Sequence, residues 1–144
     1  MKLQSKVKLL AVPAVIINSM LISMGTAQAN SPRGFTQTCT DIDAHKGTLS
    51  AKCRRIDRRY RTSSIDLNSY IANHNGVLVW SRKGNYVDTT NNCQTYTVTP
   101  YTSNLTPLSY HSCDARTIDG QNSYGTVTLD EHIENVDGQL QYFE

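Results

Sequence analysis

The sequence lacks the short motifs that mark common catalytic and nucleotide-binding sites. It contains no G-x-S-x-G nucleophile elbow, no P-loop and no G-x-G-x-x-G fingerprint. Its cysteines and histidines show neither C-x2-C nor His-x3-His spacing, which disfavours a zinc site. A hydrolase using scattered carboxylates such as Asp66 and Asp130 is disfavoured too, because a glycosidase needs two carboxylates facing each other across one bond. We therefore expect a protein that is not an enzyme and that uses neither a cofactor nor a metal.

Long apolar runs are absent beyond the first thirty residues. Three lysines precede a mostly apolar run over residues 9–24, and residues 27–29 read Ala-Gln-Ala, the pattern of a signal-peptidase site. The run is shorter than the ~20 residues that a membrane helix needs, and no later stretch is long enough to span a bilayer. We expect residues 1–29 to be a cleaved signal peptide and the protein to be secreted.

The exported part also lacks an excess of positive charge. The leader contains three of the 14 basic residues and none of the 12 acidic ones, so residues 30–144 have a formal charge of −1. A general nucleic-acid partner thereby loses its main support, and we expect none. The remaining length suits a single domain.

What the sequence does contain is a segment that occurs twice. Residues 65–80, IDLNSYIANHNGVLVW, align without a gap with residues 127–142, VTLDEHIENVDGQLQY, at an offset of 62. Each copy ends in Asn-x-Asn-Gly or Asn-x-Asp-Gly followed by a short run to an aromatic residue. A duplicated unit predicts two similar structures with two similar surface sites. The pattern favours a bivalent binding protein over an enzyme with one cleft.

The duplication also bears on domain organisation and on the cysteines. Repeat one covers about residues 35–80 and repeat two about residues 86–144. The cysteines allow three pairings, and the duplication favours the local ones, Cys39–Cys53 and Cys93–Cys113. Each bridge would stabilise the fold by roughly 3 kcal/mol. Neither repeat has enough apolar residues for its own core, so residues 30–144 are expected to form one domain.

Short strands dominate the predicted secondary structure. Residues 47–53 alternate apolar and polar, and the turn dipeptides Asn75-Gly76 and Asp137-Gly138 each precede a short alternating run, which is a strong hairpin signal. One helical turn is expected before each hairpin, the first capped by Asp66. Residues 96–109, rich in Thr, Tyr, Ser and Pro, are typical of a loop or an irregular hairpin.

Taken together, these residues resemble the cyanovirin-N lectin family. The resemblance begins at Phe35-Thr-Gln-Thr-Cys39, passes through residues 62–69 and includes both Asn-x-x-Gly-x-Leu-x-aromatic motifs, residues 73–80 and 135–142. It implies an all-β, strand-exchanged fold of two tandem pseudo-symmetric repeats, with short helical turns and one disulfide in each repeat. It also implies binding of high-mannose glycans, especially α1,2-linked mannose termini, at two opposite ends, without catalysis or metal. Either a monomer or a domain-swapped dimer is compatible with this fold.

The resemblance assigns side chains to two sugar sites. One lies where the N-terminal segment meets the last hairpin, and the matching residues here are Gln37, Thr38, Asn135 and Asp137. The other lies near the first hairpin and the second cysteine pair, matched by Asn73, Asn75 and Arg116. Amide, carboxylate and guanidinium groups suit this role because they bridge neighbouring sugar hydroxyls. The Asn and Asp residues are equally expected to serve their turns, since both types tolerate positive φ.

Two features depart from the family pattern. The family uses an acidic residue and a threonine just after the first disulfide, where this chain has Arg54 and Ile56; Arg54, Arg55 or Asp57 are candidates to replace their contacts. The second departure is extra length between Trp80 and Cys93. It leaves two candidate pairs for the side chains that form the wall of the second site, Asp88 with Thr89 or Asn91 with Asn92.

An alternative function rests on a dense group of arginines, which we call the arginine tip: Arg54, Arg55, Arg58, Arg59 and Arg61. We expect it at an exposed hairpin turn, partly neutralised by Asp57. Such a cluster suits a phosphate, a sulfated glycan or a nucleic acid. The alternative is therefore a secreted polyanion-binding module whose sugar clefts have decayed.

Overall fold

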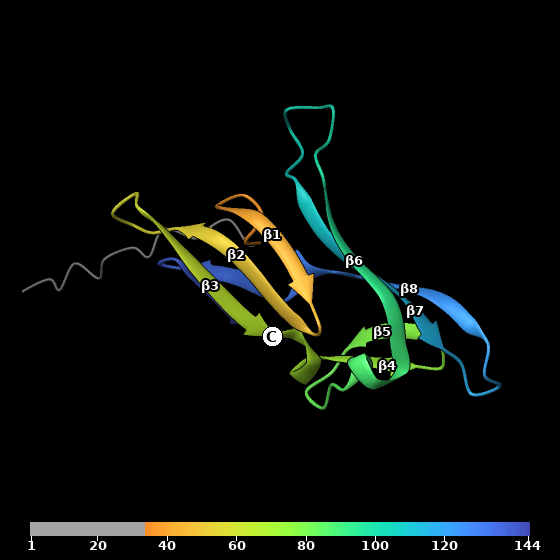
Figure 1. Ribbon diagram of the computed structural model, residues 1–144. Coiled ribbons are helices and arrows are strands. Elements are labelled where there is room, and N and C mark those ends of the chain that lie inside the picture. The colour runs from red at the N-terminus through yellow and green to blue at the C-terminus, as the bar shows by residue number, and fades with distance from the viewer. Residues whose placement is uncertain (1–33) are drawn as a thin grey trace, which may run out of the picture.

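The computed structural model describes residues 34–144, and the predicted signal peptide lies outside them. The described chain is all-β, as expected, with short 3-10 turns (Figure 1). Repeat one forms a three-stranded antiparallel sheet and a hairpin: β1 (Cys39–His45), β2 (Thr48–Arg54), β3 (Tyr60–Asp66), β4 (Ile71–His74) and β5 (Val77–Trp80). Repeat two forms the same arrangement: β6 (Thr90–Val98), β7 (Leu108–Arg116), β8 (Asn122–Thr128), β9 (Ile133–Val136) and β10 (Gln139–Tyr142). Within this range, no helix has the length and apolar character needed to cross a membrane.

The repeats exchange their hairpins. The β9–β10 hairpin of repeat two packs on β3 of repeat one, where the Leu140 amide donates a hydrogen bond of 2.9 Å to the Ser63 hydroxyl. The β4–β5 hairpin of repeat one packs on β8 of repeat two. There Gly125 lies so close to Leu78 that a Cβ at position 125 would come within 2.8 Å of its side chain. The expected strand-exchanged fold is therefore present.

One shared core holds the repeats together. The 3-10 turns η1 (Leu67–Ser69) and η3 (Leu129–Glu131) each bury a leucine completely, and the following hairpins bury Ile71 and Ile133. Each such side chain stabilises the fold by roughly 1.5–3 kcal/mol. The expected cap of η1 is also confirmed, because the Asp66 carboxylate accepts a hydrogen bond of 3.0 Å from the Asn68 amide.

Both hairpin turns have the predicted geometry. Asn75 and Gly76 have φ of 53° and 87°, and Asp137 and Gly138 have φ of 47° and 84°. Two consecutive residues with positive φ between paired strands form a type I′ turn, which matches the right-handed twist of those strands. The Asn-Gly and Asp-Gly dipeptides therefore determine both turns.

Two offsets relate the repeats along the chain. The segment that includes β1 corresponds to the one that includes β6 at an offset of 51, whereas everything from β2 to β5 corresponds to β7 to β10 at an offset of 62. The difference of 11 residues is an extension of the β6–β7 hairpin, which stands away from the rest of the molecule in Figure 1. Of the two alternatives expected for residues 96–109, a loop or an irregular hairpin, the hairpin is present. Val98 still pairs with Leu108, because the antiparallel ladder continues into the extension.

Both predicted disulfides form, but they are not at equivalent positions. Cys39 and Cys53 lie opposite each other on β1 and β2, and the corresponding pair in repeat two is Thr90 and Ala115. The second bridge instead joins Cys93 to Cys113, so it lies two residues earlier along β7. Alignment of the two repeats by their cysteines therefore misplaces the residues that follow Cys113.

Candidate functional site

The first tip site lies where the β9–β10 turn meets the end of β2 and the segment before β1. The Asn135 amide donates hydrogen bonds of 2.9 Å to the Thr38 hydroxyl and 2.8 Å to the Arg54 carbonyl oxygen, while its own oxygen accepts from the Gly138 amide at 2.7 Å. One carboxylate oxygen of Asp137 accepts a hydrogen bond of 3.0 Å from the Ile56 amide. Asn135 and Asp137 thus join three segments that are far apart in the sequence.

The second tip site repeats this arrangement with the other hairpin. The Asn73 amide donates to the Thr89 hydroxyl at 3.1 Å and to the Arg116 carbonyl oxygen at 2.8 Å, while its oxygen accepts from the Gly76 amide at 2.7 Å. The Asn75 side-chain oxygen accepts a hydrogen bond of 2.8 Å from the Ile118 amide. Every polar contact of the first tip site named above therefore has a counterpart here.

The correspondence between the two sites distinguishes the two candidate walls and identifies the counterpart of Arg116. Thr89 is the counterpart of Thr38, so of the two proposed walls it is the one with Asp88 and Thr89 that touches the β4–β5 hairpin. Arg116 is the counterpart of Arg54 and supplies its carbonyl oxygen to Asn73, whereas its side chain is exposed. Asn92 turns instead toward Asp114, to which its amide donates a hydrogen bond of 2.8 Å.

The tip asparagines have the turn role that their residue type predicts. Their amide groups are used within the protein, and they hold the neighbouring groups in place. Gln37, the Arg54 side chain and nearly half of the Asp137 side chain remain exposed beside the first turn, as do Asp88 and the Arg116 side chain beside the second. Ile56 and Ile118 are 88% and 92% exposed. Each site therefore offers exposed polar groups next to one exposed apolar side chain.

A buried carboxylate, Asp130, holds the segment before β1 in place beneath the first tip site. Its role was not predicted from the sequence. Asp130 accepts hydrogen bonds from the Thr36 amide at 2.9 Å, the Thr36 hydroxyl at 2.8 Å and the Ser109 amide at 2.7 Å. It thereby holds the segment that carries Gln37 and Thr38. Its counterpart Asn68 accepts a single hydrogen bond of 3.0 Å, from the Val87 amide.

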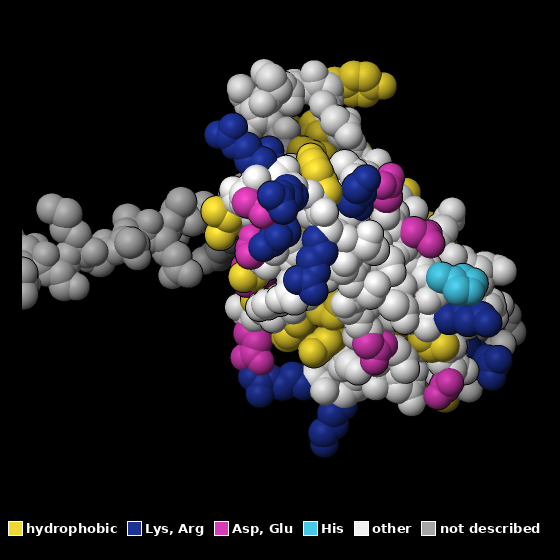
Figure 2. All heavy atoms as spheres, turned by 60° about the vertical axis from the view of Figure 1, so that its left-hand side comes forward, with side chains coloured by type: hydrophobic (Ala, Val, Ile, Leu, Met, Phe, Trp, Pro, Cys, Tyr) yellow, Lys and Arg dark blue, Asp and Glu magenta, His cyan; other side chains and the backbone are white. Residues whose placement is uncertain are grey.

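The arginine tip occupies the β2–β3 turn, directly beside the first tip site. Arg55 lies 3.2 Å from Asp57 and 3.6 Å from Asp137, so Asp57 partly neutralises the tip as predicted. Figure 2 shows several basic side chains gathered on the face at this end of the molecule. Arg59 is 81% exposed, and its Nε lies 3.9 Å from Asp57. The cluster is thus an exposed border of the first tip site.

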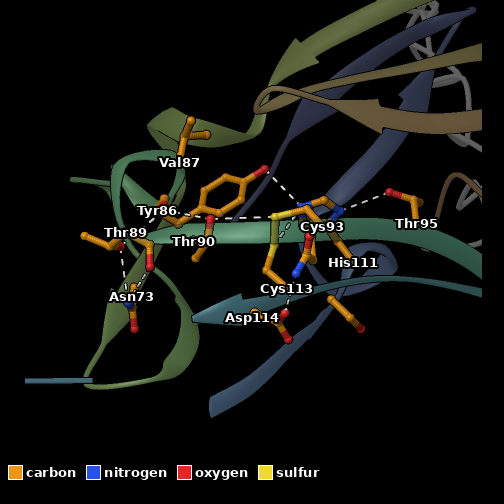
Figure 3. Close-up of a disulfide and its surroundings, with 12 residues drawn as sticks. Asn73, Tyr86, Val87, Thr89, Thr90, Cys93, Thr95, His111, Cys113 and Asp114 are labelled. Atoms are coloured by element: carbon orange, nitrogen blue, oxygen red, sulfur yellow. Dashed lines mark hydrogen bonds between the residues drawn. A yellow bond between two sulfur atoms is a disulfide. The ribbon is translucent and has the colours of Figure 1, made fainter. Parts of the chain in front are cut away.

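The second repeat has a polar core pair where the first has an apolar one. Tyr86 and His111 are the counterparts of Phe35 and Leu49, and the Tyr86 hydroxyl lies 3.0 Å from His111 Nε2 (Figure 3). The Thr95 hydroxyl lies 3.0 Å from the other ring nitrogen. Burial lowers the pKa of His111 to about 4, against a smaller opposing effect of Asp43, and burial together with Asp66 raises the pKa of Tyr86 to about 12. Both groups are therefore neutral at physiological pH.

His111 also lies against the second disulfide. Its Nε2 is 3.6 Å from Cys113 Sγ, and donor atoms of Cys93, His111 and Cys113 all lie within 4.8 Å of one another. The two sulfurs are bonded to each other, however, and a metal requires thiolates. This group is therefore a packed disulfide and not a metal centre.

Two clefts of the described chain lie away from the tips. One, of about 340 Å³, lies between the β1–β2 turn and the start of β6, and it is lined by residues that include Gly47, Tyr86 and Asn91. The other, of about 240 Å³, has Thr36, Thr40 and Pro107 among its lining residues. Asn91 and Asn92, the alternative wall residues, line the first cleft. Neither cleft is lined by Gln37, Thr38, Asn73, Asn75, Arg116, Asn135 or Asp137. The tip sites are surface features built on turns.

Comparison with known proteins agrees with this architecture. Among solved structures, the fold is similar to that of a CVNH protein of Gibberella zeae, with 23% identity, a TM-score of 0.65 and coverage of 76% of this chain and 97% of that one. Microvirin in complex with mannobiose is similar at 25% identity and a TM-score of 0.58, covering 76% and 98%. A variant of MoCVNH3 in complex with (N-GlcNAc)4 is similar at 22% identity and a TM-score of 0.62, covering 79% and 99%. Residues 35–141 match the CVNH domain. The chain is thus a member of the CVNH domain family, the cyanovirin-N homologues that the sequence resembles.

Proposed function

We propose that this protein is a secreted, non-enzymatic lectin that binds mannose-rich glycans, in particular α1,2-linked mannose termini, at its two tip sites. The observation that carries the proposal is the duplication of the tip geometry in a chain that belongs to the CVNH family. Microvirin, which was solved with mannobiose, matches this chain over 98% of its own length. The partners are high-mannose oligosaccharides or glycoproteins.

The tip geometry suits a sugar for physical reasons. A pyranose presents neighbouring hydroxyls that both donate and accept, together with an apolar face. Turns clamped by Asn135 and Asn73 hold polar groups in fixed positions, which lowers the ordering cost of binding. Exposed Ile56 and Ile118 offer an apolar surface beside them.

Calorimetric titration of the oxidised protein with α1,2-mannobiose tests the proposal. We expect saturable binding with two sites for each chain. Asn135→Ala/Asp137→Ala is expected to reduce this to one site, because it removes the clamp and the exposed carboxylate together. Asp137→Asn is the matched control, since it copies Asn75 and keeps the acceptor for the Ile56 amide.

The folded state of each variant is checked by the dispersion of its amide NMR spectrum. Absence of saturable binding by the wild-type protein at millimolar sugar would contradict the proposal. Unchanged stoichiometry in a folded Asn135→Ala/Asp137→Ala variant would mean that the sugar binds elsewhere.

A further inference from the structure

The β2–β3 and β7–β8 turns, which we call the first and second tips, carry the two tip sites and have the same backbone contacts. At an offset of 62, Arg54, Ile56 and Asp57 of the β2–β3 turn correspond to Arg116, Ile118 and Asp119 of the β7–β8 turn. The Ile56 and Ile118 amides are bound in the same way by the exchanged hairpins. The other four arginines of the tip are not duplicated: repeat two has Thr117, Gly120, Gln121 and Ser123 where repeat one has Arg55, Arg58, Arg59 and Arg61. A comparison of the two tips within one molecule therefore isolates the effect of the four additional arginines.

The two tips differ strongly in charge. Lys52, which precedes the first tip on β2, corresponds to Asp114 on β7. With Lys52, the five arginines, Asp57 and Asp137, the first tip has a formal charge of +4. With Asp88, Asp114, Arg116 and Asp119, the second has −2. Charge differences of this size change the local concentration of anions within a Debye length of about 8–10 Å. The two sites therefore present different electrostatic environments to a sugar.

One arginine has a backbone conformation that disfavours it. Arg58 has φ of 66°, and its counterpart is Gly120 with φ of 83°. A side chain in this left-handed region costs roughly 1–2 kcal/mol, which glycine avoids. Repeat one therefore has a strained arginine at the position where repeat two has glycine.

Two of the arginines lie against the turn of the first tip site. Arg55 packs over the β9–β10 turn, because a Cβ on Gly138 would come within 2.6 Å of its Cγ and 3.4 Å of the Arg61 Cβ. Within residues 34–144, Arg54, Arg58 and Arg61 are exposed and form no ion pair. A guanidinium group binds sulfate, phosphate or carboxylate through two parallel hydrogen bonds.

We infer that the first tip site prefers an anionic sugar, that is, a glycan unit bearing a sulfate, phosphate or carboxylate group, to a neutral one, whereas the second tip site has no such preference. The inference rests on the proposed function, since it assigns a substrate class to one of its two sites. Arg54, Arg58, Arg59 and Arg61 contact the anionic substituent, and the turn residues contact the ring. Arg55 positions the site through its ion pair with Asp137.

The test is an NMR titration of the oxidised protein with two probes, α1,2-mannobiose and the same disaccharide carrying one 6-O-sulfate. The Ile56 and Gly138 amides report the first site, and the Ile118 and Gly76 amides report the second. At the first site we expect the sulfated probe to bind about tenfold more tightly than the neutral one, as one charge-assisted hydrogen bond would give. The preference should fall with added salt, and the second site should show none.

Exchange of side chains between the tips provides matched variants. Arg58→Gly/Arg59→Gln/Arg61→Ser gives the first tip the residues of the second at these three positions and lowers its formal charge from +4 to +1, and we expect its ratio of sulfated to neutral affinity to fall towards one. Gln121→Arg/Ser123→Arg adds charge to the second tip without placing a side chain at Gly120, and it should create a preference there. Amide spectra establish that both variants are folded.

The outcomes separate the inference from the proposed function. Neutral disaccharide that shifts neither set of amides would overturn the proposed function. Equal affinity of the two probes at the first site would overturn the inference alone. Inorganic sulfate that produces the same shifts at the same concentrations as the sulfated probe would overturn it too, because the sugar would then contribute nothing.

Discussion

At the residue scale, His111 makes the stability of the fold depend on pH. The unfolded chain protonates this histidine near pH 6.5, but burial lowers the pKa in the folded protein to about 4. Between these values the unfolded state binds more protons, so the free energy of unfolding falls as the pH falls from about 6.5 to 4. The loss should reach about 3 kcal/mol, with no further contribution from this group below pH 4. Urea denaturation at a series of pH values measures it.

The first repeat supplies the control for this prediction. Tyr86→Phe/His111→Leu installs the counterparts Phe35 and Leu49, so neither member of this pair is left facing a lost partner, although the half-buried Thr95 hydroxyl loses its hydrogen bond to the His111 ring. The double variant should keep the stability that the wild type loses between pH 6.5 and 4. An unchanged pH dependence in the double variant would assign that loss to other groups.

At the element scale, the junction between η3 and the N-terminal segment depends on Asp130. Asp130→Asn replaces one carboxylate oxygen by an NH2 group, which then faces the donor of either the Thr36 amide or the Ser109 amide. Unpaired buried donors cost roughly 1–3 kcal/mol. We expect that loss in the free energy of unfolding, together with faster hydrogen exchange of the amides before β1. The reverse change at the counterpart, Asn68→Asp, keeps its single acceptor and should alter the free energy of unfolding by less than about 1 kcal/mol.

Should Asp130→Asn leave both the free energy of unfolding and the hydrogen exchange unchanged, the carboxylate would not be what holds this segment.

The role of Asp130 also shows where sequence reasoning reaches its limit. The type I′ turns and the capped helical turn were predictable because neighbouring residues determine them. The contact between Asp130 and Thr36 joins residues 94 positions apart, and it depends on the strand exchange.

The second disulfide illustrates the same limit. The pairing of Cys93 with Cys113 was predictable from duplication, but its position on the strands was not, because the extension of the β6–β7 hairpin changes the offset from 62 to 51. The offset of 62 relates Arg116 to Arg54 already in the sequence, but it does not relate Thr89 to Thr38. The strand register and the hydrogen bonds of Asn135 and Asn73 identify Thr89 as the counterpart of Thr38.

At the scale of the whole molecule, strand exchange determines where the two tip sites lie. Each exchanged hairpin meets the far end of the opposite sheet, so the β2–β3 and β7–β8 turns lie at opposite ends of the molecule (Figure 1). Two sites pointing apart cannot both bind neighbouring sugars of one short glycan, but they can join two glycans. Linked sites gain avidity on clustered glycans without any new contact.

This arrangement predicts cross-linking of a multivalent mannose-rich glycoprotein by the wild-type protein. Turbidity should rise on mixing, pass through a maximum near equivalence and fall with excess free α1,2-mannobiose. Asn135→Ala/Asp137→Ala, with one remaining site on each chain, should still bind the glycoprotein but produce no turbidity as a monomer. Size-exclusion chromatography with light scattering is run in parallel, because a domain-swapped dimer of the variant would again carry two sites. Cross-linking by a variant that is monomeric in that measurement would contradict a bivalent molecule with one sugar site at each end.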